Sequence, residues 1–362
     1  MSKRIYNFYA GPATLPLPVL EEAQREFLDF KSTGISVLEI SHRAKPYDEV
    51  HQQTEARLKK ILGLGDDFRV LFLQGGASTQ FAMVPMNFLS PKKKADYIIT
   101  GSWAKKAFKE ATRYGQIKVA ASSEETNFTY IPSPDQLKIS PDCAYVHLTS
   151  NNTIFGTQWQ SFPDFGEVPI VADMSSDILS RPFNPEKFGL IYAGAQKNLG
   201  PAGVTVVIIR KDFAESANDD LPTMLKYETH LKANSLFNTP PVFSIYLLNL
   251  VLKWLENKGG LKAMVEINQE KADIIYDEID ESAGYYRGHS QEESRSLMNI
   301  TFCLPREELE KKFIAEAEER GMIGLKGHRS VGGLRASIYN AMPLEGAKAL
   351  AAFMREFRKE NP

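Results

Sequence analysis

Short hydrophobic runs followed by turn residues recur through the middle of the chain. Five such runs are rich in Val, Ile, Leu, Tyr and Phe, and helix-length segments separate most of them. This pattern predicts buried strands of a mainly parallel sheet. A sixth run, "GVTVVIIR" (203–210), follows the fifth too closely for a crossover helix, so we expect it to pair antiparallel. The five runs, with the residues that follow them, are "RVLFLQGGAST" (69–79), "ADYIITGSW" (95–103), "CAYVHLTSNNT" (143–153), "VPIVADMSS" (168–176) and "FGLIYAGAQK" (188–197).

Helical patterns flank this region. One helix is expected to open near Pro18, and the segment "HQQTEARLKKILGL" predicts a second that ends at Gly63 and Gly65. The stretch 122–142 is polar, contains three prolines and indicates a surface connection.

A glycine pair in "ENKGGLKA" (256–263) is the best candidate for a hinge. Beyond it, amphipathic helices alternate with strand-like runs, which favours a small α+β domain. We therefore predict an irregular N-terminal arm (1–15), a large α/β domain (16–258) and a small C-terminal domain (259–362).

Composition narrows the class of protein. The chain has 362 residues, of which 43% are hydrophobic, and 43 Lys and Arg against 45 Asp and Glu give a net charge of −2. Such a near-neutral chain offers no bulk electrostatic attraction for nucleic acid or an anionic membrane. Its 2 cysteines form neither a disulfide framework nor a metal-binding spacing. With no secretory leader and no membrane-length apolar run, we expect a soluble, cytoplasmic protein.

Residues that could carry chemistry follow the predicted strands. Ligands of open α/β sheets gather where parallel strands end. A glycine turn at 75–76 opens a helix and suits a phosphate, and Trp103, Thr153, Asp173 and Lys197 follow later strands. Taken alone, each of these residues has a simpler explanation. Trp103 could be a core or surface anchor, Thr153 a turn residue, Asp173 a helix cap and Lys197 a solvated lysine. Together they describe a pocket for pyridoxal phosphate, which needs a lysine for its Schiff base, a carboxylate for its ring nitrogen and a phosphate cup.

Five motifs carry a resemblance to a known family. The segments "NFYAGPATLP", "SHRAKPYDEV", "IYAGAQKNLGPAG", "FNTPP" and "GHRSVGGLRASIYNAMP" together resemble the phosphoserine aminotransferases, which are fold-type-I pyridoxal-phosphate enzymes. The resemblance extends from residue 7 to the C-terminus. It implies a homodimer with active sites at the subunit interface, and a large domain built on a mainly parallel seven-stranded sheet.

The resemblance also implies a function for individual residues. Lys197 would form the Schiff base, with one pyridoxal 5'-phosphate per subunit, and Asp173 would hold the pyridine nitrogen. The remaining cofactor contacts would be Trp103 as the stacking ring, Thr153 and Gln196 near the phenolic oxygen, Ala77 and Ser78 in the phosphate cup, and Asn238 and Thr239 from the other subunit. Some relatives carry an arginine close to where Ala77 and Ser78 stand, so this cup must rely on backbone N–H groups, hydroxyls and the helix dipole.

The implied reaction is reversible amino transfer between L-glutamate and 3-phosphohydroxypyruvate, giving 2-oxoglutarate and O-phospho-L-serine. Both amino acids carry two anionic groups, which arginine side chains bind well. By resemblance, Arg335 takes the α-carboxylate. The pair His42 and Arg43, from the partner subunit, would hold the distal carboxylate or phosphate with help from His328 and Arg329. Lys197 would act as the general base, and burial should lower its pKa.

Other functions remain open at this point. Another small fold-type-I transaminase, of the alanine– or serine–glyoxylate type, would use the same cofactor. A cysteine desulfurase needs a mobile cysteine, whereas Cys143 and Cys303 both lie in apolar runs and are expected to be buried. A silent protein that retains pyridoxal phosphate, or a plain α/β protein without cofactor, are the remaining alternatives. Activity on a phosphorylated hydroxythreonine is also left open.

Overall fold

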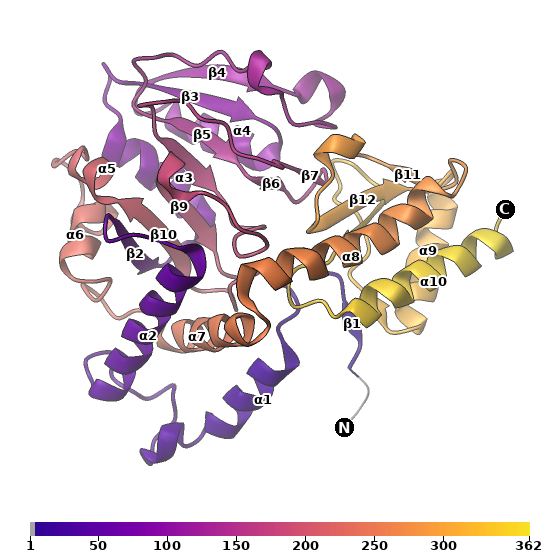
Figure 1. Cartoon of the computed structure of the whole chain (residues 1–362), viewed down its shortest axis with the longest axis horizontal. Helices are drawn as coiled ribbons and strands as arrows, with labels where there is room; N and C mark the ends of the chain where they lie inside the picture. The colour runs from indigo at the N-terminus through magenta and orange to yellow at the C-terminus, as the bar shows by residue number, and fades with distance from the viewer. Residues whose placement is uncertain (1–3) are drawn as a thin grey trace.

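A seven-stranded sheet forms the centre of the computed structural model, which describes residues 4–362 (Figure 1). In spatial order its strands are β2 (Phe68–Leu73), β10 (Thr205–Arg210), β9 (Phe188–Gly194), β8 (Ile170–Asp173), β5 (Val146–Thr149), β3 (Lys94–Ile99) and β4 (Gln116–Ser122). The strands from β9 to β4 run parallel, whereas β10 pairs antiparallel with both β9 and β2. The predicted fold class and the antiparallel pairing of the sixth run are both confirmed.

Helices cover both faces of this sheet, which explains its continuous hydrophobic strands. On one face, Val70 and Phe72 of β2 pack with α2 and α7, and on the other Leu71 and Leu73 pack with α3 and α4. All residues of β5, β8 and β9 are buried. The helices of this part are α1 (Leu17–Glu26), α2 (Lys45–Leu62), α3 (Gly76–Phe88), α4 (Ser102–Ala111), α5 (Lys211–Glu215), α6 (Tyr227–Lys232) and α7 (Val242–Asn257).

The strand β4 was not predicted from the sequence. It lies at the edge of the sheet, and Ala120 is its single fully buried residue. An edge strand with only one fully buried residue carries no continuous hydrophobic run, so its sequence lacks the signal that marked the central strands. The polar connection that follows, 122–142, contains two short 3₁₀ turns, Glu124–Thr126 and Pro134–Gln136.

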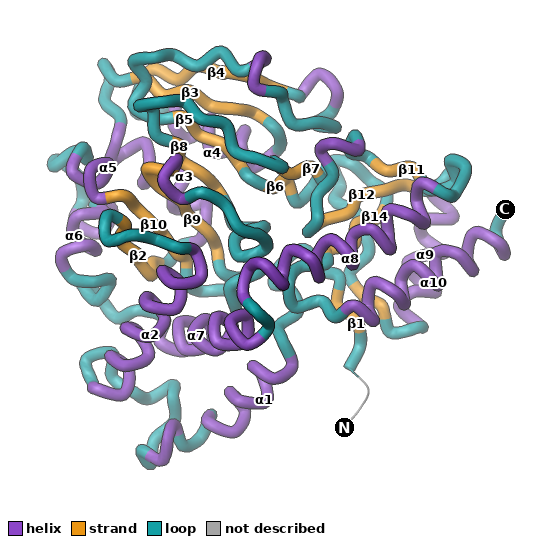
Figure 2. Tube along the Cα trace, viewed as in Figure 1, coloured by secondary structure: helices purple, strands orange, loops and turns teal. Residues whose placement is uncertain are grey.

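The C-terminal part has a hydrophobic core of its own, which includes Ile300, Phe313 and Met354. In Figure 1 its orange and yellow elements lie beside the large sheet, and Figure 2 shows its strands as a separate group. Its elements are α8 (Gly260–Asp280), β11 (Arg287–Gly288), β12 (Asn299–Cys303), α9 (Glu307–Glu319), β13 (Met322–Ile323), β14 (Leu334–Ser337) and α10 (Leu344–Glu360). The strands β11, β12 and β14 form an antiparallel sheet.

Gly259 precedes α8 and Gly260 is its first residue, with φ angles of +97° and +70°. Both angles lie in the left-handed region that glycine adopts at little cost. The proposed domain boundary between residues 258 and 259 falls at this break.

The N-terminal segment packs on the C-terminal part. Tyr6 and Asn7 form β1, which pairs parallel with Met322 and Ile323 of β13, and Phe8 is buried in the C-terminal core. Further along, the amide of Ala13 donates to Gln196 O at 2.8 Å. This segment therefore connects the C-terminal part to the chain beside Lys197. Among residues 4–362, no helix is both long and apolar enough to cross a membrane.

Candidate active site

Lys197, Asp173 and Thr153 meet where the central strands end. Asp173 is the last residue of β8, and Lys197 follows β9. Thr153 follows the short strand β6 (Asn151–Asn152), which pairs with β7 (Thr157–Gln158). The Lys197 amine donates to Thr153 Oγ1 at 3.1 Å. Parallel strands with adjacent ends thus bring together residues that lie far apart in the sequence.

Burial shifts the pKa values of both ionisable groups toward their neutral forms. It lowers the pKa of Lys197, with the charge of Asp173 opposing this shift and the charge of Arg335 adding to it. Burial likewise raises the pKa of Asp173, against the charge of Lys197 and the hydrogen bond from Ser175. The amide of Ser175 donates to Asp173 Oδ1 at 2.9 Å. An amine with a lowered pKa beside a buried carboxylate is typical of catalytic sites.

Arg335 reaches the same place from the C-terminal part. It lies on β14, opposite Thr301 of β12, and its Nη1 donates to Thr153 O at 3.3 Å. Its buried Nε has no hydrogen-bond partner in the described part of the chain, and burial lowers its pKa. Thr153 therefore contacts Lys197 through its hydroxyl and Arg335 through its carbonyl.

Trp103 lies in the first turn of α4, half-buried against the core between α4 and the sheet. Its indole Nε1 is buried and has no hydrogen-bond partner within residues 4–362. The amine of Lys106 lies over its ring, 4.2 Å from the centroid. Reasoning from the sequence missed Lys106, whose position three residues after Trp103 on α4 places both on one face of that helix.

Several positive charges act on His328. Burial lowers its pKa, and the charges of Arg335, Arg329 and Lys106 lower it further. His42 and Arg43 lie in the loop before α2, half-buried and exposed respectively. No hydrogen bond within residues 4–362 joins their side chains to the other candidate residues.

The glycine turn after β2 begins a helix, as predicted. Gly75 precedes α3 with φ +92°, and a Cβ there would lie 2.0 Å from Thr79 Oγ1. Ala77 is half-buried and Ser78 exposed in the first turn, where backbone N–H groups have no intrahelical acceptor. Asn238 Nδ2 lies 3.4 Å from both Gln74 Oε1 and Thr239 O. A single chain thus places Asn238 beside the residue that precedes this turn.

Comparison with known proteins agrees with this geometry. Residues 5–350 match the family model described as aminotransferase class-V. The chain belongs to the class-V aminotransferase family. It is 61% identical over 357 residues to the phosphoserine aminotransferase of Geobacillus kaustophilus, covering 99% of each chain.

Two solved structures of similar proteins reinforce the family assignment. The phosphoserine aminotransferase from Bacillus circulans subsp. alkalophilus matches with a TM-score of 0.98 and 57% identity, covering 100% of both chains. The phosphoserine aminotransferase from Trichomonas vaginalis, a structure with bound PLP, matches with a TM-score of 0.92 and 42% identity, covering 97% of this chain and 100% of that one.

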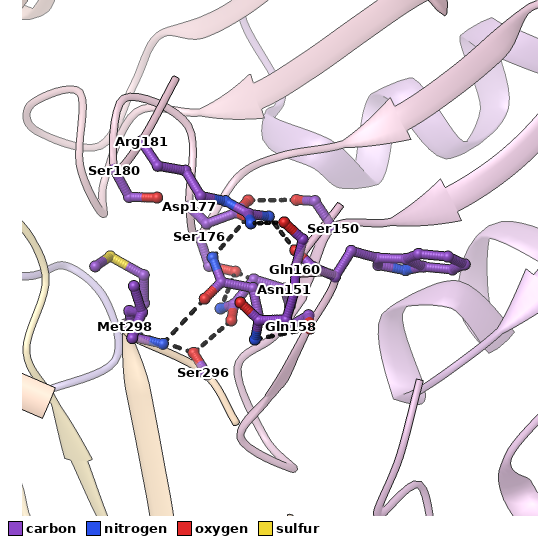
Figure 3. Close-up of polar contacts among 12 residues, drawn as sticks. Ser150, Asn151, Gln158, Gln160, Ser176, Asp177, Ser180, Arg181, Ser296 and Met298 are labelled. Carbon is purple, nitrogen blue, oxygen red and sulfur yellow. Dashed lines mark hydrogen bonds and ion pairs between the residues drawn. The ribbon is translucent and has the colours of Figure 1, made fainter. Parts of the chain in front are cut away.

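In this class-V aminotransferase, Ser150, Gln158 and Asp177 belong to a buried polar network (Figure 3). Ser150 Oγ donates to Asp173 O at 3.0 Å and also to the Asp177 carboxylate. Gln158 Nε2 donates to Asp177 at 3.0 Å, and Arg181 lies 3.9 Å away. Asn151 Nδ2 then donates to Asn299 in the C-terminal part at 2.8 Å. The network fixes the backbone that carries Asp173 and joins it to the C-terminal part.

Gln196 lies next to Lys197 and folds back on its own strand. A Cβ on Gly194 would lie 2.7 Å from Gln196 Oε1, so the glycine leaves room for this side chain. Asn198, on the other side of Lys197, accepts a hydrogen bond from the amide of Asn340 at 3.0 Å. The lysine is thereby held between the N-terminal segment and the C-terminal part.

The two cysteines differ in exposure. Cys143 is buried, as expected, and burial raises the pKa of its thiol to about 11. The expectation that Cys303 is also buried was wrong, because it is half-buried. Side chains alternate along β12, so Cys303 lies on the face opposite Phe302, and it is less buried than Thr301 because it is the last residue of the strand. Neither thiol belongs to the lysine site, and the described residues hold no cluster of potential metal ligands.

Proposed function

We propose that this protein is a pyridoxal-phosphate-dependent aminotransferase that transfers the amino group of L-glutamate to 3-phosphohydroxypyruvate. The observation that carries the proposal is the meeting of Lys197, Thr153, Asp173 and Arg335 at one end of the sheet. The full-length similarity to proteins named phosphoserine aminotransferase supports the choice of substrates.

The residues present fit pyridoxal phosphate. Lys197 offers a half-buried amine, and Asp173 offers a buried carboxylate whose Oδ1 already accepts one hydrogen bond. The first turn of α3 offers unpaired N–H groups to a phosphate, with the positive end of the helix dipole. Trp103 offers an aromatic ring with an unpartnered N–H. Lys197 would hold the cofactor covalently and Asp173 its ring nitrogen, while Thr153, Gln196, Ala77 and Ser78 would make the remaining contacts within the chain.

When bound, pyridoxal phosphate withdraws electrons from the substrate's α-carbon and so makes its proton removable. The Lys197 amine would act as the general base that accepts this proton. The same amine would then deliver the proton to the carbon that carried the cofactor's aldehyde group. Burial favours the neutral amine that this step needs. Thr153 Oγ1, at 3.1 Å from Nζ, sets the direction in which the amine approaches.

Positive groups orient the two anionic substrates. Arg335 is proposed to bind the α-carboxylate, because its guanidinium is fixed to Thr153 beside Lys197. His328 and Arg329 are proposed to bind the distal carboxylate or phosphate. Within residues 4–362 no hydrogen bond joins the side chains of His42 and Arg43 to the other candidates, so we assign them to the site of a partner subunit in a homodimer. Asn238 and Thr239 are proposed for the partner's phosphate cup on the family resemblance alone, because Asn238 also lies 3.4 Å from Gln74 of its own chain. We place this dimer in the cytoplasm.

The visible spectrum of the purified holoenzyme tests the proposal. Glutamate should bleach the cofactor absorbance, and 3-phosphohydroxypyruvate should restore it. A yellow protein without a response to glutamate would instead be a silent cofactor-binding protein. Recovery with glyoxylate but not with the phosphorylated keto acid would indicate a glyoxylate-type transaminase. A colourless protein that takes up no cofactor would refute the proposal.

A Lys197→Ala variant supplies the matching control. It should lose essentially all turnover while still binding the cofactor without a covalent bond, because Asp173 and the α3 turn remain. Near-normal rates would exclude Lys197 as the proton-transferring group.

A further inference from the structure

Lys106 is a positive charge at the candidate site to which no function has been given. It lies on α4 three residues after Trp103, and its amine is 4.2 Å from the centre of the Trp103 ring. A cation held over an aromatic face is attracted by the ring's electrons. The interaction therefore keeps an otherwise flexible side chain close to the residue proposed to stack on the cofactor.

The neighbouring lysine shows a different arrangement. Lys105 forms an ion pair with Glu124, whereas within residues 4–362 no carboxylate lies at ion-pair distance from Lys106. Both lysines are exposed and occupy the same helix. The charge of Lys105 is thus already compensated, and that of Lys106 remains available to an anion.

Lys106 is one of several positive charges that act on His328. Besides burial, the charges of Arg335, Arg329 and Lys106 each lower the pKa of His328, because they disfavour its protonated form. These groups come from α4, from β14 and from the loop before β14. Like charges brought together from separate segments repel each other, and a bound anion relieves that repulsion.

The orientation of His328 adds a hydrogen-bond donor to this group. The amide of Ser330 donates to His328 Nδ1 at 3.2 Å, and the Ser330 hydroxyl lies 2.7 Å from the same nitrogen. A nitrogen that accepts from an amide carries no proton, so in the neutral ring the proton is on Nε2. His328 can then donate to an anion without becoming charged.

We infer that Lys106 is a specificity residue that binds the distal phosphate of the substrate and so favours a phosphorylated substrate over a dicarboxylate. This inference rests on the proposed function and names a residue that the family resemblance did not supply. A phosphate monoester carries close to two negative charges at neutral pH, against one for the distal carboxylate of glutamate. Coulomb energy scales with charge, so removing Lys106 should cost about twice as much free energy for the phosphate as for the carboxylate. The fold-loss for the phosphorylated substrate should therefore be roughly the square of the fold-loss for glutamate.

The two half-reactions of one enzyme measure this difference. Lys106→Met keeps an unbranched side chain of similar length and removes the charge. At pH 8 it should lower the specificity constant for O-phospho-L-serine about tenfold and that for glutamate about threefold, as expected for a partly screened site. Lys106→Arg should retain most of the wild-type preference. Lys105→Met is the matched control, and it should change neither constant more than about twofold.

The dependence on pH separates charge recognition from a structural effect. Below about pH 6 the phosphate loses its second charge, so the loss caused by Lys106→Met on O-phospho-L-serine should shrink toward threefold. Equal losses for both substrates, a loss independent of pH, or the same loss in Lys105→Met would each overturn the inference. If the wild-type enzyme showed no half-reaction with O-phospho-L-serine, the proposed function itself would fail, which is a distinct result.

Discussion

Lys271 offers a sharp test of how burial controls charge in this fold. Its side chain has 0% exposure on α8, and its amine donates to Ile338 O and Tyr339 O, each at 2.8 Å. These carbonyls follow β14, the strand that carries Arg335. Burial lowers the pKa of Lys271 from 10.5 to about 7. That difference in pKa corresponds to about 5 kcal/mol. The free energy of unfolding is lower by this amount when the folded protein must hold the amine in its charged form.

The sign of the pH effect follows from proton binding. Between pH 7 and pH 10.5 the unfolded chain holds the Lys271 proton and the folded chain does not. The contribution of Lys271 to the free energy of unfolding therefore rises with pH in that window, by about 1.4 kcal/mol per pH unit. In Lys271→Met this contribution is absent. The free energy of unfolding of the wild type minus that of the variant should increase by about 3 kcal/mol from pH 7.5 to pH 9.5.

Urea unfolding of the cofactor-free protein, followed by circular dichroism at pH 7.5, 8.5 and 9.5, measures this difference. Other titrating groups are common to both proteins and cancel in the comparison. Lys262→Met is the control, because Lys262 lies exposed on the same helix and its removal should leave the pH dependence unchanged. A wild-type-minus-variant difference that is flat or falls with pH would refute the argument.

Two further predictions concern the site and the thiols. Asp173→Asn should lower kcat by at least about 100-fold, because a neutral amide cannot hold a protonated ring nitrogen; a steady-state assay showing less than a tenfold loss would contradict the assignment. In the folded protein a thiol reagent should modify Cys303 and leave the buried Cys143 untouched until unfolding, with full retention of activity. Peptide mass spectrometry that finds Cys143 labelled before Cys303 would contradict the prediction that burial protects the Cys143 thiol.

The central strands and the residues at their ends could be predicted from the sequence. Continuous hydrophobic runs marked β5, β8 and β9, and the rule that ligands gather where parallel strands end brought Asp173 and Lys197 together. The edge strand β4 could not be found in this way, because only Ala120 among its residues is fully buried. Its polar face resembles a surface loop when read without its neighbours.

Contacts between distant segments were beyond the reach of local patterns. The register of β14 against β12 sets the position of Arg335 next to Thr153, and the sequence carries no local signal for that register. Asp177 and Ser150 are polar residues whose type suggests a surface, yet they are buried because they hydrogen-bond each other. Only the family resemblance had pointed to Arg335.

The central claim is that Lys197 is the amine that holds the cofactor. Reduction of the holoenzyme with borohydride fixes a cofactor–lysine bond permanently, and digestion followed by mass spectrometry locates it. We expect the pyridoxyl group on the peptide containing "YAGAQKNLGPAG", at Lys197. A modification on another lysine, such as Lys106, with Lys197 unmodified would contradict the account.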